Sequence, residues 1–135
     1  WDFTWDSKFG DYSARNMAYI NQGHIEAPII VSMDGQLVNP VIQLYIDGEL
    51  AQEVTVNTTI AEGEKLLYSS RENDFYIKKQ NANGTYTDLF NLSIINFAND
   101  NVIRIPKNKS CQIRLTADND VLNAQVTILA FYKAV

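Results

Sequence analysis

Few side chains in this sequence are of the types that carry out catalysis, and they lie far apart along the chain. The single histidine, His24, has no serine or cysteine nucleophile motif near it, so a surface turn is its expected setting. The single cysteine, Cys111, lies in the alternating stretch "SCQIRLT" and is expected to be a small buried hydrophobe. One histidine and one cysteine are too few for a metal site built on them. We therefore expect no enzyme activity, no cofactor and no metal.

Acidic side chains offer two further possibilities for chemistry. The run Asp118, Asn119 and Asp120 lacks the later glycine and glutamate of a calcium loop, so it predicts a plain polar turn. A carboxylate pair for glycoside hydrolysis stays open, because the separation that matters is spatial. The candidate glutamates all adjoin turns, where a solvated charge is the usual role: Glu49, Glu53, Glu62 and Glu64.

The N-terminal stretch "WDFTWDSKFGDY" is the densest in aromatic residues. Trp1, Phe3 and Trp5 alternate as on a strand, while Trp1 and Trp5 also have the spacing of one helix face. Exposed tryptophans can stack on the apolar faces of sugars, whereas buried ones pack on a sheet or on a neighbouring domain. Trp1 and Trp5 are therefore candidate contacts for a sugar or a partner. Because the chain starts with Trp1 rather than Met, we expect it to be a processed product or a piece of a longer protein.

Composition and charge narrow the class of protein. A chain of 135 residues with 46% hydrophobic residues can bury a core without a disulfide, which one cysteine could not form. The net charge of -5 and the scattered basic residues argue against binding to nucleic acid. No apolar run approaches the ~20 residues of a membrane-spanning helix, so no membrane is expected as a partner.

The elements that position these residues are predicted to be strands. Alternation places one set of residues on the inner face of a strand within residues 25–33: Ile25, Ala27, Ile29, Val31 and Met33. A second strand places Cys111, Ile113 and Leu115 inward. The C-terminal stretch "AQVTILAFYKAV" alternates as well, and it is apolar on both faces at Leu129 and Phe131. We therefore expect it to be a central strand.

Turn signals separate the predicted strands at short intervals. Asp47-Gly48 is the signature of a two-residue hairpin turn, and Asn83-Gly84 is a second candidate for such a turn. Glu62-Gly63 precedes another short strand, whereas residues 88–97 are ambiguous between a helical turn and a strand. Many short strands joined by hairpins predict an all-β fold, an antiparallel β-sandwich.

Five residues interrupt the stretch between Asn21 and Tyr45: Gly23, Pro28, Gly35, Asn39 and Pro40. Pro28 cannot donate to a ladder and is expected at an edge, a bulge or the first paired residue. Gly35 ends the first strand, and the turn there suggests a positive φ. Asn39 precedes a proline and is expected to be extended, with Pro40 fixing the start of the next strand.

This layout of strand, glycine, Asn-Pro and strand resembles the C-terminal domain of siphophage distal tail proteins, the hubs at the tip of long non-contractile tails. The resemblance covers residues 21–135, although Asn99-Asp100-Asn101 lacks the glycine of the corresponding motif. The residues that carry it most clearly are Asn21, Gly23, Glu26, Ala27, Pro28, Gly35, Asn39 and Pro40.

The resemblance implies a sandwich of galectin-like, jelly-roll type at residues 17–135, with residues 1–16 as an aromatic segment left from a linker or preceding domain. It implies a virion component made in the bacterial cytoplasm, which serves as scaffold or platform for host-attachment proteins of the tail tip or baseplate. Its homo-oligomeric ring would close through an N-terminal domain absent from these residues. The alternative is a carbohydrate-binding module of lectin-like fold, with cell-surface polysaccharide as its partner, since a fold does not determine a function.

Overall fold

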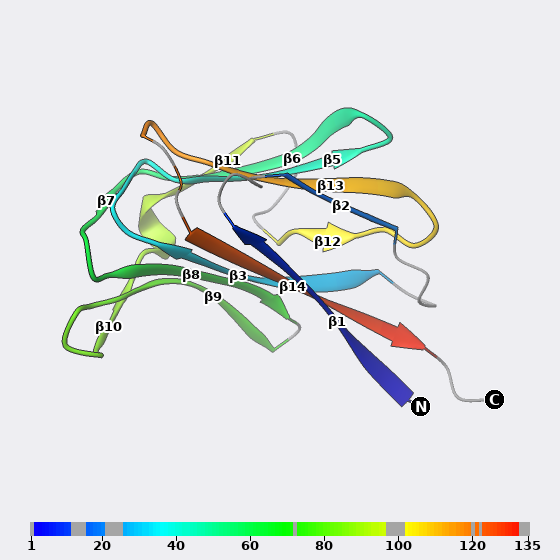
Figure 1. Cartoon of the computed structure of the whole chain (residues 1–135), viewed down its shortest axis with the longest axis horizontal. Helices are drawn as coiled ribbons and strands as arrows, with labels where there is room; N and C mark the ends of the chain where they lie inside the picture. Colours follow the sequence, from blue (N-terminus) through cyan, green and yellow to red (C-terminus); the bar gives the residue numbers. More distant parts are fainter. Residues whose placement is uncertain are drawn as a thin grey trace.

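Two antiparallel sheets lie face to face in the computed structural model, with the hydrophobic core between them (Figure 1). The structure describes residues 2–11, 16–20, 26–71, 73–96, 102–119, 121 and 123–132. The prediction of an all-β antiparallel sandwich is confirmed.

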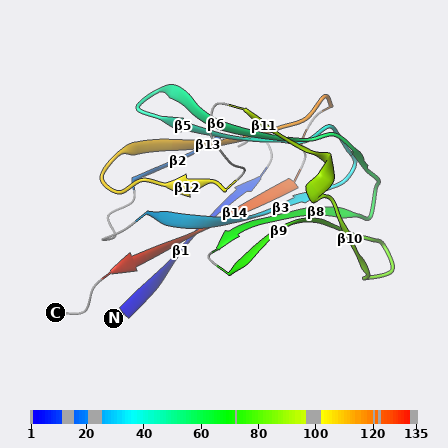
Figure 2. The ribbon, with the colours of Figure 1, turned by 180° about the vertical axis from the view of Figure 1, so that it is seen from behind.

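The first sheet contains the first and last strands of the described chain side by side. Its order is β1 (Asp2–Asp11), β14 (Asn123–Tyr132), β3 (Ala27–Asp34), β8 (Lys65–Arg71), β9 (Asp74–Gln80) and β10 (Tyr86–Asp88), while β12 (Arg104–Ile105) pairs with the start of β3. The same strands are seen from behind in Figure 2.

The second sheet covers the inner face of the first. Its order is β11 (Ser93–Asn96), β6 (Glu49–Val56), β5 (Val41–Ile46), β13 (Ser110–Thr116) and β2 (Asn16–Ile20). A small separate ladder joins β4 (Leu37–Val38) to β7 (Thr59–Ile60), and one short 3-10 helix, η1 (Phe90–Leu92), precedes β11.

The core is built by alternation along the strands. In β3 the residues Ala27, Ile29, Val31 and Met33 are fully buried, as predicted, while Ile25 lies outside the described residues. In β13 the predicted inward residues Cys111, Ile113 and Leu115 are buried as well. Burying one such aliphatic side chain contributes about 1.5–3 kcal/mol, so the periodicity of the sequence selects the faces of the sheets.

Strand β14 lies between β1 and β3, which confirms the prediction of a central strand. Its register joins Val126 to Val31 of β3, and Leu129 is buried in addition to the alternating inner residues. Strand β1, from the aromatic N-terminal segment, pairs with β14 from Asp2 to Asp11. The backbone of this segment is therefore an edge strand of the first sheet.

Two buried side chains fix the segment that leads into β12. The hydroxyl of Tyr68 accepts the N–H of Ile103 at 2.7 Å, and the hydroxyl of Ser70 donates to the carbonyl of Ile103 at 2.5 Å. Ser70 also accepts the N–H of Ile29 at 2.9 Å. Because these backbone groups are buried, the hydroxyls provide bonds that water cannot supply there.

The hairpin between β5 and β6 turns at Asp47-Gly48 as predicted. Asp47 has φ 51° and Gly48 has φ 85°, and Ile46 pairs with Glu49 across the turn. Both central residues of this turn need positive φ, which Asp and Gly adopt at low cost.

The hairpin between β9 and β10 exists, but the predicted two-residue turn at Asn83-Gly84 is wrong. Asn81 donates its N–H to the carbonyl of Thr85 at 2.7 Å, and Gly84 has φ 87°. The loop therefore has three residues, 82–84, and Tyr86 pairs with Gln80. A turn followed by a glycine in the left-handed region is the usual form of a three-residue hairpin loop.

Glu62-Gly63 precedes β8 as predicted, with Gly63 at φ 84°. The ambiguous segment 88–97 contains both elements that were considered, because η1 is followed directly by β11.

Gly35 is needed for a different reason than the predicted one. Its φ is outside the positive region; instead, a Cβ there would lie 2.0 Å from the carbonyl oxygen of Ala61. Its N–H donates to the carbonyl of Glu64 at 2.8 Å. Two backbone segments thus approach too closely for any side chain at this position.

Asn39 is not extended, contrary to the prediction, but has φ 49°. Its N–H donates to the carbonyl of Thr58 at 2.8 Å, and its side-chain amide donates to Asp118 Oδ2 at 2.9 Å. These contacts outweigh the preference for extended backbone at a residue before proline. Asparagine also tolerates the left-handed region better than most residues. Pro40 is buried, its carbonyl accepts the N–H of Val56 at 2.9 Å, and β5 begins at the next residue.

Candidate functional site

The described residues that carry the resemblance support the backbone and do not form one site. Ala27 is fully buried, Pro28 pairs with Arg104 of β12 near the start of β3, and Glu26 is exposed just before that strand. Gly35, Asn39 and Pro40 shape the connection between β3 and β5, as described above. Asn21 and Gly23 lie outside the described residues.

The side chains of the two candidate tryptophans lie outside what the structure describes. Trp1 lies outside the described residues, and the backbone of Trp5 pairs with Leu129 in the β1–β14 ladder. His24 also lies outside the part of the chain that the structure describes.

In the polar run that begins at residue 118, the described residues Asp118 and Asn119 lie in a bend, which is held by a polar clamp between Gln36–Asn39 and Asp118–Asn119. Asn119 accepts the N–H of Val38 at 2.9 Å and donates to the carbonyl of Gln36 at 2.8 Å. Asp118 donates its N–H to the carbonyl of Val38 at 2.8 Å. Asp120 lies outside the described residues. Among the described residues, no group of three or more histidine, cysteine, aspartate or glutamate side chains is placed to hold a metal ion.

The thiol of Cys111 is buried, as predicted, with 2% of its surface exposed. Burial raises the pKa of this thiol above its ordinary value, and the nearby carboxylate of Asp47 acts in the same direction. Lys109 opposes the shift, but more weakly. The thiol stays protonated at neutral pH, and a protonated thiol is a poor nucleophile.

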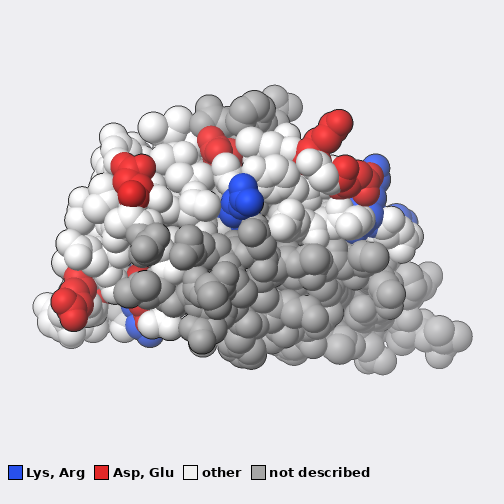
Figure 3. Space-filling model, turned by 45° about the horizontal axis from the view of Figure 1, so that its top comes forward, with Lys and Arg blue, Asp and Glu red and all other residues white. Residues whose placement is uncertain are grey.

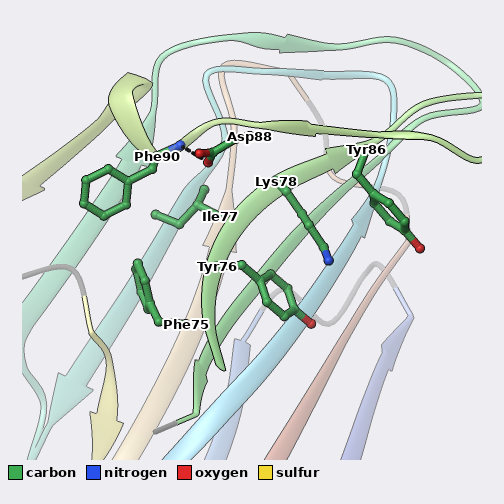
Figure 4. Close-up of a pocket in the computed structure, with 7 residues that line it drawn as sticks. All are labelled: Phe75, Tyr76, Ile77, Lys78, Tyr86, Asp88 and Phe90. Atoms are coloured by element: carbon green, nitrogen blue, oxygen red, sulfur yellow. Dashed lines mark hydrogen bonds between the residues drawn. The ribbon is translucent and has the colours of Figure 1, made fainter. Parts of the chain in front are cut away.

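A hollow of about 410 Å³ opens on the outer part of β9 and β10, and we call it the tyrosine hollow (Figure 4). It lies within the ~300–1,000 Å³ typical of ligand sites. Its lining combines four aromatic side chains and one isoleucine with one cation and one carboxylate: Phe75, Tyr76, Ile77, Lys78, Tyr86, Asp88 and Phe90.

The register of the hairpin brings three of these side chains together. Tyr76 and Lys78 lie two apart on β9 and so share its outer face, while Tyr86 pairs with Gln80, two residues further along the same face. The Nζ atom of Lys78 lies 4.2 Å from the ring centroid of Tyr76 and 4.4 Å from that of Tyr86. The ammonium group is therefore held between two aromatic rings by cation–π attraction.

The other side of the hollow is packed against the core. Phe90 meets Phe75 edge-to-face at a centroid distance of 5.9 Å, and Phe75 meets the buried Tyr68 in the same manner at 6.0 Å. The N–H of Phe90 donates to Asp88 Oδ1 at 2.9 Å. Phe90 keeps 48% of its surface exposed and Tyr86 keeps 57%, so aromatic surface remains free on a supported framework.

A second hollow of about 320 Å³ lies near the start of β3. It contains Glu26 and Arg104 as its charged residues, beside Gln52, whose side-chain amide donates to the carbonyl of Val102 at 2.9 Å. The described residues of its lining include no aromatic ring for stacking, so the tyrosine hollow is the stronger candidate for a ligand site.

Charge is dispersed over the visible surface. Figure 3 shows separate acidic and basic side chains among the described residues of that face, without a continuous basic patch. An interface for nucleic acid would require such a patch. Within the described residues, no helix has the length and apolar character needed to cross a membrane.

Comparison with protein-family models and with curated proteins finds no match for this chain. The fold and the geometry of the sites are therefore the basis for inferring its function.

Sequence reasoning overlooked the tyrosine hollow and concentrated on the aromatic N-terminus. One signal was present: Tyr76 and Lys78 alternate in "DFYIKK", and Tyr86 follows the hairpin turn. That signal leads to the site only if the loop length is known, because loop length decides which residues share a face.

Proposed function

We propose that this chain is a structural domain of a phage or prophage tail tip, where it serves as scaffold or platform for host-attachment proteins. The proposal rests on one observation: the residues that carry the resemblance to distal tail proteins shape the backbone of the sandwich. Gly35, Asn39 and Pro40 shape the backbone of an antiparallel sandwich, and they do not meet in a reaction centre. An architectural role for the motif is consistent with an architectural role for the domain.

The proposal also explains the sparse chemistry of the described residues. The thiol of Cys111 is buried, and the clamp residues Asp118 and Asn119 are engaged in hydrogen bonds to another loop. We propose that the domain has no catalytic activity, that other tail-tip or baseplate proteins are its partners, and that the virion is its location.

Sedimentation tests the structural role. In the tail proteins that this chain resembles, an N-terminal domain closes the ring, so we expect the 135 residues alone to be monomeric or weakly dimeric. A longer protein that contains them should form a closed ring of symmetric copies, visible by electron microscopy. A stable ring from the 135 residues alone would contradict this assignment, and so would a monomeric longer protein.

A second candidate function, carbohydrate binding, is favoured by the tyrosine hollow. Exposed aromatic rings beside polar groups are the usual means of holding a sugar, because the rings stack on apolar faces and the polar groups bond hydroxyls. Titration of ¹⁵N-labelled protein with neutral oligosaccharides tests it through the amide shifts of Tyr76 and Tyr86. Shifts confined to these strands would support the candidate, and unchanged spectra at millimolar sugar would reject it for neutral ligands.

A further inference from the structure

We propose that the tyrosine hollow binds a saccharide or polyol unit that carries an anionic group, a phosphate or a carboxylate, and that Lys78 contacts the anion. This inference rests on the second candidate function above and specifies its ligand. It concerns the described residues of β9, β10 and η1 alone.

Lys78 differs in its partners from three other cations of its sheet. Lys65 lies 3.8 Å from Asp34, Lys79 lies 3.5 Å from Glu64, and Arg71 is paired with Asp74. In the part of the chain that the structure describes, the ammonium of Lys78 has aromatic partners and no ion pair. Its charge is therefore held in position without being neutralised.

The acid that could neutralise Lys78 is used elsewhere. Asp88 pairs directly with Lys78 in the β9–β10 ladder, where opposite charges usually attract. Its carboxylate instead accepts the N–H of Phe90 at the start of η1. A second carboxylate oxygen remains to accept a hydroxyl, so the hollow offers both a cation for an anion and an acceptor for a polyol.

The donors of the hollow point to the same side. In Figure 4 the side chains of Tyr76, Lys78 and Tyr86 run in the same direction, so the two hydroxyls and the ammonium end on the same side. A lysine chain already held between two rings loses less freedom on binding than a free one. Phosphate and carboxylate oxygens are the acceptors that form the strongest bonds with such charged donors.

The shape of the hollow favours a ring or a short chain over a bare ion. The exposed ring of Phe90 lies across the hollow from the tyrosines, and the volume of about 410 Å³ exceeds the space that a single anion needs. The net charge of -5 repels anions at long range, so recognition has to come from these local contacts.

Three matched hexoses and one ion test the inference by NMR titration of the 135-residue protein. The probes are glucose, glucuronate, glucose 6-phosphate and inorganic phosphate. We expect the two charged hexoses to shift the amides of Lys78 and Tyr86 and to bind at least about tenfold more tightly than glucose or inorganic phosphate. A difference between glucuronate and glucose 6-phosphate would then identify which anion is preferred.

Variants assign the effect to the lysine. Lys78→Met should lower the affinity for charged hexoses to that for glucose, and Lys78→Arg should retain the preference. Lys79→Met is the matched control, because it removes the same charge from the opposite face of the same strand and should leave the preference unchanged. Dispersed amide spectra of each variant verify that it is folded.

The outcomes distinguish failure of this inference from failure of the carbohydrate-binding function on which it rests. If glucose binds as tightly as the charged hexoses, the inference is overturned while sugar binding stands. If no hexose shifts the spectrum, both fail, and the tail-tip proposal is unaffected. If inorganic phosphate alone matches glucose 6-phosphate, the site takes an ion and no saccharide, which also overturns the inference.

Discussion

Replacing Gly35 with alanine tests whether the close backbone approach at this residue holds the sandwich together. A Cβ at Gly35 would lie 2.0 Å from the carbonyl oxygen of Ala61 and 2.8 Å from its carbonyl carbon. Real Cβ contacts essentially never fall below 3.0 Å, so the two segments must separate by about 1 Å or more. Both contacts are backbone atoms, and no flexible side chain can move aside.

The expected fall in the free energy of unfolding has two parts. Forcing extra volume into a packed site costs about 1–3 kcal/mol. Separation also stretches the 2.8 Å hydrogen bond from the Gly35 N–H to the Glu64 carbonyl, which contributes about 1 kcal/mol. We expect Gly35→Ala to lower the free energy of unfolding by about 2–4 kcal/mol. At a urea dependence of about 2 kcal/mol per M, the midpoint falls by roughly 1–2 M.

Gly48→Ala provides the matched control. Gly48 has φ 85°, and a Cβ added there would meet nothing within 4 Å, so its substitution introduces conformational strain without a clash. That strain costs about 1 kcal/mol. Urea unfolding followed by tryptophan fluorescence compares the two variants with the parent. Equal midpoints for Gly35→Ala and Gly48→Ala would refute the argument from close approach.

Further substitutions and treatments at Tyr68, Asn119 and Cys111 probe other contacts. Tyr68→Phe removes the acceptor of the buried Ile103 N–H and should lower the free energy of unfolding by about 1–3 kcal/mol in urea melts, whereas an unchanged midpoint would show that this bond contributes nothing. Asn119→Ala removes two hydrogen bonds of the polar clamp and should cost about 1–2 kcal/mol by the same measurement; a loss below about 0.5 kcal/mol, roughly the smallest change such melts resolve, would contradict it. The Cys111 thiol should react with a thiol reagent much more slowly in the native protein than in urea. The pKa of this thiol is raised in the folded protein, so the folded state keeps a proton that the unfolded state loses above about pH 8.5. The free energy of unfolding should therefore fall as the pH rises above about 8.5. A Cys111→Ala variant should lack this part of the pH dependence.

The strands were predictable because their signal is local. Alternation alone placed Val31 and Ile113 inside, and the positive φ required at Asp47-Gly48 identified the turn between β5 and β6. Each of these features depends on neighbours in the sequence, and burial of one face then fixes the pairing.

Features set by distant residues were predicted wrongly. Asn39 has a positive φ because it bonds Thr58 and Asp118, which no local rule for a residue before proline contains. Gly35 is required because Ala61 approaches it, and that approach exists only once β4 and β7 have paired. In both cases the determining contact lies many residues away along the chain.

The tyrosine hollow was not predicted because the loop between β9 and β10 was predicted one residue too short. A two-residue turn at Asn83-Gly84 would pair Tyr86 with Asn81 and place its side chain on the face opposite to Lys78. The observed three-residue loop pairs Tyr86 with Gln80 and brings its ring to the ammonium. Since side chains alternate along a strand, a slip of one residue moves each of them to the other face.

The position of β14 has a consequence for the order in which the chain can complete its fold. This strand fills the gap between β1 and β3, yet it is the last of the described strands to be synthesised. On the ribosome, the edge of β3 that β14 covers therefore stays without its native partner while the intervening strands emerge. An unpaired strand edge is a template for association with other chains. The edge of β3 therefore stays open to association with other chains until β14 has left the ribosome and covered it.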